Sequence, residues 1–126
     1  MVELEAWYDV EADDPAILTT AAEVDALLDR MVSDSLAFDV PPLVELSFAD
    51  VVAYVGVDAK RQRGFITYND TISATDDPDS TPVEYDYMGN VREIPAYAEI
   101  PLSDVRTATL DLLTGRPSEA ITWRTV

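Results

Sequence analysis

The sequence predicts an α+β fold, in which a twisted, mainly antiparallel sheet of about six strands packs two helices on one face. Two observations support this prediction. Apolar residues recur with helical spacing over residues 20–34 and again after Ser103, and between these stretches they alternate with polar residues, as in strands. Separate groups of helices and strands are typical of α+β folds. The length of 126 residues and the hydrophobic content of 48% suit one domain, 1–126, with its own core.

The N-terminal part predicts a strand followed by a helix. Residues 2–9, "VELEAWYD", alternate between apolar and mostly acidic positions, which indicates a strand with one solvated face. Thr20 and Glu23 then form a T-x-x-E capping box that starts a helix. Apolar positions at i, i+3, i+4 and i+7 give this helix its buried stripe, namely Val24, Leu27, Leu28 and Met31.

The middle of the chain predicts strands and one long loop. The expected strands cover residues 43–48, 51–58, 64–69 and 83–87, and the second of them is apolar enough to be central. Residues 70–82, "DTISATDDPDSTP", are predicted to form a loop. Residues 91–101 are extended but interrupted by two prolines, which suits an edge strand or an irregular crossing.

The C-terminal part predicts a second helix and a last strand. Ser103 is the expected N-cap, and Asp104 suits the first turn because of the helix dipole. The predicted buried stripe consists of Val105, Ala108, Thr109, Leu112 and Leu113. Gly115 suits the left-handed position after a helix, and a strand is expected at 120–124. "TGRP" at 114–117 is therefore interpreted as scaffold, not as an anion site built on Arg116.

The charge of the chain is its strongest global property. Twenty-five acidic and eight basic residues give a net charge of −17. This charge repels nucleic acid and anionic membranes, so neither is an expected partner, and it attracts a protein with a basic surface. Adaptation to high salt, or solubility alone, explains the same composition. With no apolar run of about 18 residues and no basic leader at the N-terminus, the expected location is the cytoplasm.

The composition offers little catalytic equipment. Cysteine and histidine are absent, which removes the thiol nucleophile and the commonest general base. The many carboxylates single out no acid–base pair, so no enzyme, catalytic residue, metal or cofactor is predicted. An EF-hand starting at Asp77 fails, since Pro82 and Met88 occupy the positions of the required Gly and Glu, although a looser calcium site stays open. "KRQR" at 60–63 is interpreted as an exposed hairpin tip.

A group of tyrosines and acids predicts the surface that a partner contacts. Tyrosine supplies contact area at low entropic cost, and carboxylates complement a basic target. The predicted contact residues are Tyr68, Asp70, Asp76, Asp77, Asp79, Glu84, Tyr85, Asp86 and Tyr87, with Asp25 and Asp29 on the outer face of the first helix. Asp25 and Asp29 are like charges at i and i+4, a mildly unfavourable pair. The alternative is that the tyrosines belong to the core beside a solubilising loop.

Two blocks of sequence resemble a known family. "GVDAKRQRGFITYND" at 56–70 and "IPAYAEIPLSDVRTATLDLLTGRPSEAITW" at 94–123 are similar to the immunity protein Imm1 family of bacterial polymorphic toxin systems. The resemblance implies a small cytosolic α+β protein, encoded beside a toxin that it neutralises by direct binding, often a nucleic-acid deaminase. It implies no catalytic residues. Residues 71–93 match no family pattern and are where partner specificity is expected.

These observations lead to one main hypothesis and two alternatives. The main hypothesis is a non-enzymatic immunity protein, or antitoxin, that blocks the positively charged active-site cleft of a cognate toxin. The first alternative is an acidic nucleic-acid mimic that inhibits DNA- or RNA-binding enzymes. The second is a small ligand-binding α+β domain, which a deep pocket with converging carboxylates would favour.

Overall fold

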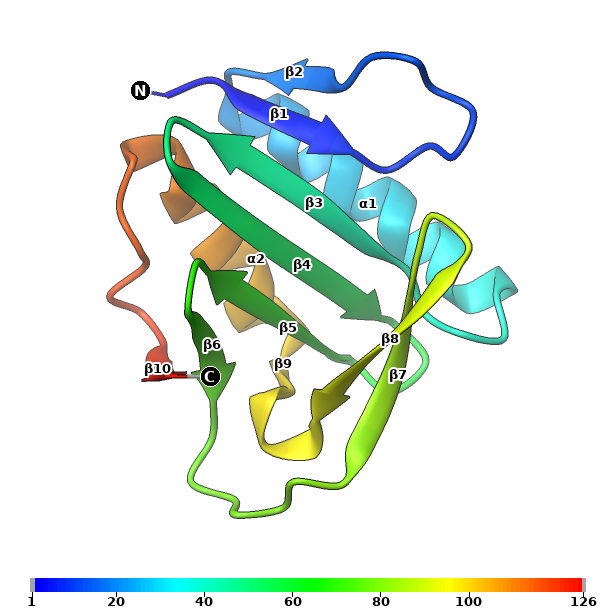
Figure 1. The fold of residues 1–126 in the computed structure, drawn as a ribbon, viewed down its shortest axis with the longest axis vertical. Coiled ribbons are helices and arrows are strands. Elements are labelled where there is room, and N and C mark those ends of the chain that lie inside the picture. The colour runs from blue at the N-terminus through cyan, green and yellow to red at the C-terminus, as the bar shows by residue number, and fades with distance from the viewer. Residues whose placement is uncertain (1, 126) are drawn as a thin grey trace.

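A computed structural model describes residues 2–125 and has the predicted α+β architecture. A curved antiparallel sheet carries helices α1 and α2 on one face, and a separate hairpin, β7–β8, crosses in front of the other face (Figure 1). The helices are α1 (Ala21–Ala37) and α2 (Leu102–Asp111), with short 3-10 turns η1 (Ala96–Ala98) and η2 (Leu112–Thr114). Neither α-helix is long and apolar enough to cross a membrane among the residues described.

The strands are more numerous than the predicted six. They are β1 (Leu4–Trp7), β2 (Ala16–Leu18), β3 (Leu43–Phe48), β4 (Val51–Asp58), β5 (Arg63–Tyr68), β6 (Thr71–Ala74), β7 (Pro82–Tyr87), β8 (Asn90–Pro95), β9 (Ile100–Pro101) and β10 (Thr122–Thr125). The main sheet has the order β10-β6-β5-β4-β3-β1-β2, and β9 pairs with β5 outside this path. All of these pairings are antiparallel.

Strand β6 contradicts the predicted loop at 70–82. Thr71 pairs with Tyr68 across a tight turn, in which Asn69 adopts a φ of 49°, and β10 then pairs along the other edge of β6. The side-chain hydroxyl of Ser73 is buried, accepts from the amide of Ile66 and donates to the carbonyl of Ala98. Serine is typical of loops in sequence, whereas Ser73 completes hydrogen bonds inside the core. The loop was therefore predicted where β6 forms.

Helix α1 forms as predicted. The amide of Glu23 donates to the Thr20 hydroxyl at 3.2 Å, while the Glu23 carboxylate accepts from the Thr19 amide at 3.0 Å, one residue before the usual partner in a capping box. Val24, Leu28 and Met31 are buried against the sheet, and Leu27 packs at the edge of the same cluster.

The prediction of Ser103 as the N-cap of α2 is wrong, since the helix starts at Leu102, two residues earlier than that cap implies. Pro101 occupies the cap position, where its missing N–H leaves no donor unsatisfied, and the Leu102 amide donates to the Gln62 carbonyl at 3.2 Å. The predicted apolar stripe is buried, and Gly115 has a φ of 80° after the last turn, as its sequence position suggests.

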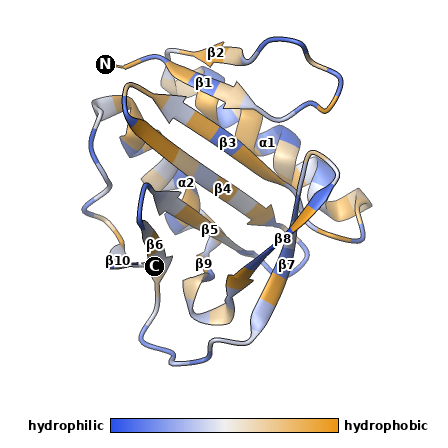
Figure 2. Cartoon of the chain, in the orientation of Figure 1, coloured by the Kyte–Doolittle hydropathy of each residue, from blue (hydrophilic) through white to orange (hydrophobic). Residues whose placement is uncertain are grey.

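Two apolar clusters lie on the two faces of the sheet. The larger cluster joins the helices to β1, β3, β4 and β5, and the smaller one joins β7–β8 to the opposite face through Leu43, Phe65, Tyr85 and Ile94. Figure 2 shows the resulting pattern, with the central strand β4 largely hydrophobic and the segment between β6 and β7 hydrophilic. The hairpin turns at Met88 and Gly89, both with positive φ. Its tip lies beside the C-terminal half of α1 (Figure 1).

Candidate partner-binding surface

The predicted contact residues do not form one patch. They lie in the acidic loop 75–81, on the β7–β8 hairpin, at the β5–β6 turn and on α1. Because these elements lie in different parts of the fold, each group has its own surroundings.

The acidic loop 75–81 is exposed but held in place. Asp76, Asp77 and Asp79 project into solvent. The backbone of the loop is tied to η1, since the Tyr97 amide donates to the Asp79 carbonyl at 2.7 Å and the Thr75 amide donates to the Tyr97 carbonyl at 2.8 Å. The Thr81 hydroxyl and amide both donate to the Asp79 carboxylate, which lowers the pKa of Asp79 below its usual value. The loop therefore presents fixed negative charges.

The β7–β8 hairpin carries four predicted contact residues, of which three are accessible to a partner and one is buried. Glu84 is exposed, and Asp86 is half-buried near the tip. Tyr87 is half-buried, with its ring edge-on to Tyr54 at a centroid distance of 5.9 Å. Tyr85, in contrast, is fully buried and packs on Phe65, so the prediction that it offers contact area at the surface is wrong for this fold.

Of the two predicted contact residues at the β5–β6 turn, Asp70 is the exposed one. Asp70 is exposed in the turn, but Tyr68 packs on the helix side of the sheet against Trp123 and Phe48. The Tyr68 hydroxyl donates to the Gly115 carbonyl at 3.4 Å. The alternative interpretation of the tyrosines, as core residues, thus holds for Tyr85 and in part for Tyr68.

The like charges on α1 share a counter-ion from α2. Arg106 donates to Asp25 at 2.9 Å and to Asp29 at 2.8 Å. One guanidinium therefore relieves the repulsion predicted for this i, i+4 pair. These carboxylates join the two helices, and their charge is partly neutralised before any partner arrives.

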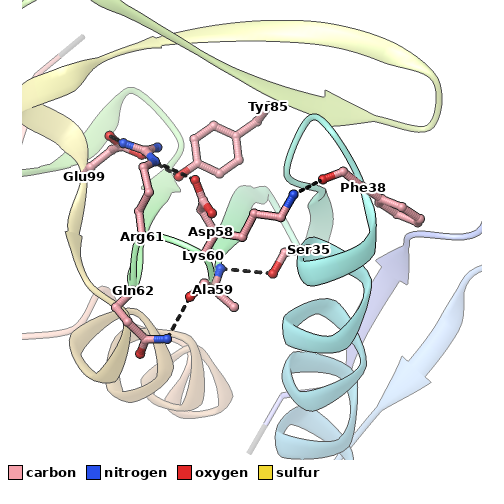
Figure 3. A network of polar contacts seen from close by, with 9 residues as sticks. All are labelled: Ser35, Phe38, Asp58, Ala59, Lys60, Arg61, Gln62, Tyr85 and Glu99. Atoms are coloured by element: carbon pink, nitrogen blue, oxygen red, sulfur yellow. Dashed lines mark hydrogen bonds and ion pairs between the residues drawn. The ribbon is translucent and has the colours of Figure 1, made fainter.

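The exposed hairpin tip predicted at 60–63 is confirmed, since all four residues are exposed where β4 turns into β5. Residues 58–62 also form a polar network there (Figure 3). Arg61 donates to Asp58 at 2.6 Å and, through both terminal nitrogens, to Glu99, which also accepts from the Tyr85 hydroxyl at 2.7 Å. Asp58 and Glu99 are each only 6% exposed. Bidentate pairing with Glu99 raises the pKa of Arg61, so the network stays charged. The network joins the β7–β8 hairpin, through Tyr85, to the turn before β5. Its carboxylates already accept hydrogen bonds from Arg61 and Tyr85.

A hollow of about 280 Å³ lies between the hairpin tip, the end of β1 and the last turns of α1. We call it the tip cleft and define it by its apolar walls and its carboxylates, namely Val10, Phe38 and Met88 with Asp9, Asp34 and Asp86. Sequence reasoning singled out Asp86 only. The others were missed because they come from segments that are distant in sequence and carry no motif.

The carboxylates of the described residues do not gather into a metal site. Among residues 2–125 no three acidic side chains are placed so that they could hold a metal ion. In the loop proposed as a loose calcium site, Asp77 and Asp79 instead accept hydrogen bonds from backbone amides two residues further on.

Comparison with known proteins gives one finding. A family model described as "Immunity protein Imm1" matches residues 12–125, which is most of the chain. No curated protein matches the sequence.

Proposed function

We propose that this chain, which belongs to the Imm1 immunity protein family, neutralises a toxin that acts on nucleic acid. It would do so by occupying the toxin's basic active-site cleft. The family supports an immunity role, in which the chain binds a cognate toxin protein and acts without catalysing a reaction. The match over residues 12–125 is the observation that carries the proposal. A deaminase is our choice of toxin chemistry.

The charge supports occupation of the cleft. A toxin that acts on nucleic acid needs a positive cleft to hold phosphates. The net charge of −17 complements such a cleft, and only Arg30, Arg61 and Arg106 among the eight basic residues form ion pairs within residues 2–125. Most carboxylates therefore remain available. The predicted residues that are accessible and form no ion pair among the described residues are Asp70, Asp76, Asp77, Asp79, Glu84, Asp86 and Tyr87. Asp25 and Asp29 are accessible as well, but both are paired with Arg106.

The first experiment is co-expression with the toxin encoded beside this chain. We expect the chain to rescue growth and to co-purify with the toxin at low ionic strength. An unrelated protein of equal length and charge serves as the control and should not rescue. Loss of viability in the presence of well-expressed chain would refute the proposal.

A nucleic-acid mimic is the alternative that the charge also favours. Because a mimic recognises the phosphate-binding property alone, it should compete with DNA for several unrelated DNA-binding proteins. An immunity protein should bind its cognate toxin and leave these proteins unaffected. Competition measured against a panel of such proteins separates the two functions.

A further inference from the structure

We infer that the tip cleft receives a single basic side chain of the toxin, flanked by apolar residues, and that this contact anchors the complex. The inference rests on the proposed function and assigns a docking point to it. Four segments build the cleft: residues 8–10 after β1, the C-terminal half of α1 with the following Phe38, residues 42–43 at the start of β3, and the tip of β7–β8.

The walls of the cleft expose apolar surface that the fold itself does not use. Val10 is 66% exposed and Phe38 is 45% exposed, and both line the hollow together with the half-buried Met88. Exposed apolar side chains that gather around a hollow with polar residues at its rim mark interaction sites, and aromatic and methionine side chains are enriched at such sites.

The charges of the cleft identify the occupant as cationic. Asp9, Asp34 and Asp86 line it, whereas Arg30 is its one basic lining residue among residues 2–125. Arg30 is already committed, because both of its terminal nitrogens donate to Asp9 and its guanidinium lies over the Tyr8 ring at 4.9 Å. The cleft is left with an excess of negative charge.

Asp34 and Asp86 have acceptor capacity to spare. Asp34 accepts from the Tyr8 hydroxyl at 2.6 Å and lies 3.9 Å from the Arg30 Nε, which leaves further lone pairs. The Asp86 amide donates to the Pro41 carbonyl, but its carboxylate has no hydrogen-bond partner among residues 2–125. Asp86 is therefore the carboxylate best placed to receive a new donor.

An arginine or lysine side chain matches this combination of walls and charges. Its aliphatic stem can lie along Val10 and Met88 while its charged end reaches the carboxylates. The Phe38 ring adds a face on which a cation can rest. A purely apolar segment matches the walls alone, and an acidic segment is repelled by the carboxylates.

The test compares cleft variants with controls of equal chemistry elsewhere. Asp86→Asn removes one charge from the cleft, and Asp50→Asn removes one charge from the exposed β3–β4 turn. Phe38→Ala truncates a wall residue, and Ile17→Ala truncates a residue of nearly equal exposure, 46%, on β2. Binding to the purified toxin is measured by surface plasmon resonance at low and high salt, after thermal unfolding has shown that each variant folds.

We expect Asp86→Asn and Phe38→Ala each to weaken binding about tenfold or more, mainly by faster dissociation, because both remove a buried contact. Asp50→Asn and Ile17→Ala should stay within about twofold. For Asp86→Arg, a scan of the toxin's basic residues to Asp should find one reversal that restores binding. Folded Asp86→Asn and Phe38→Ala variants that bind like the original chain would overturn the cleft assignment alone. Failure of the original chain to bind the toxin would overturn the proposed function as well.

Discussion

Tyr85 is the residue whose chemistry differs most from its sequence-based interpretation. It was predicted to contact a partner, but it is fully buried and donates to Glu99, which Arg61 also holds. Burial, and then the charge of Glu99, raise the pKa of Tyr85 far above the usual value of 10.0. Burial and the Asp34 carboxylate raise the pKa of Tyr8 in the same way. Both phenols therefore stay protonated in the folded chain under conditions that ionise them in the unfolded chain.

This difference predicts alkaline instability. Because the folded pKa lies above the unfolded one, the full contribution to stability is present below pH 10 and is lost progressively as the pH rises further. Each such tyrosine lowers the free energy of unfolding by up to about 1.4 kcal/mol per pH unit in that range. At pH 7 the Tyr85→Phe substitution should lower the free energy of unfolding by about 1–3 kcal/mol, because it removes a hydrogen bond to a charged group. Above pH 10 the free energy of unfolding of this variant should decline less steeply than that of the original chain.

Urea unfolding of the original chain and of Tyr85→Phe between pH 8 and 11 measures both effects. Tyr97→Phe provides a comparison at a tyrosine whose hydroxyl has no hydrogen bond among residues 2–125, and it should leave the decline unchanged. An identical alkaline slope in the original chain and in Tyr85→Phe would contradict the assignment.

The β7–β8 hairpin depends on one close approach to the main sheet. The rings of Phe65 and Tyr85 meet edge-on, with centroids 4.8 Å apart, directly over Gly56 of β4. A Cβ at position 56 would overlap the Phe65 ring and lie 2.8 Å from Cδ2 of Tyr85. Glycine is needed here for space, and the packing of two elements depends on it.

Gly56→Ala should therefore destabilise the chain by about 1–3 kcal/mol, since either the aromatic pair or the hairpin must move. Val52→Ala, at a position of the same strand that is 38% exposed, should cost less than Gly56→Ala, about 1 kcal/mol or below. Thermal or urea unfolding gives both numbers. A Gly56→Ala chain as stable as the original would show that the hairpin yields easily.

Local patterns predicted the elements well and their arrangement poorly. The stripe on α1, the alternation in β3 and the left-handed Gly115 all follow from rules that act within a few residues, and the structure confirms them. Strand β6 was missed because Ser73 looks like a loop residue in sequence and because the pairing of β6 with β10 joins segments some fifty residues apart. The tip cleft was missed for the same reason, since Val10, Phe38 and Met88 meet only after the chain has folded.

At the scale of the whole molecule, negative charge is spread over both α-helices, several strands and the loops. The acids occur on β1, in the loops, along α1, on the hairpin and on α2, while few arginines neutralise them. Such a chain repels itself when it folds and attracts a basic partner from a distance. Salt must weaken both effects, because the Debye length falls from about 30 Å at 0.01 M to about 8 Å at 0.15 M.

The two consequences of salt have opposite signs, and this opposition separates partner binding from salt adaptation as the reason for the acidity. Between 10 and 500 mM NaCl the free chain should become more stable, as its melting temperature reports, while its association rate with the toxin should fall by about tenfold or more. Dissociation should change much less, since contacts in the tip cleft are shielded from solvent ions. If the acidity served only adaptation to salt, added salt would raise the melting temperature in the same way but would leave the association rate unchanged. Stopped-flow association at several salt concentrations, alongside thermal melts of the free chain in the same buffers, therefore decides between the two explanations.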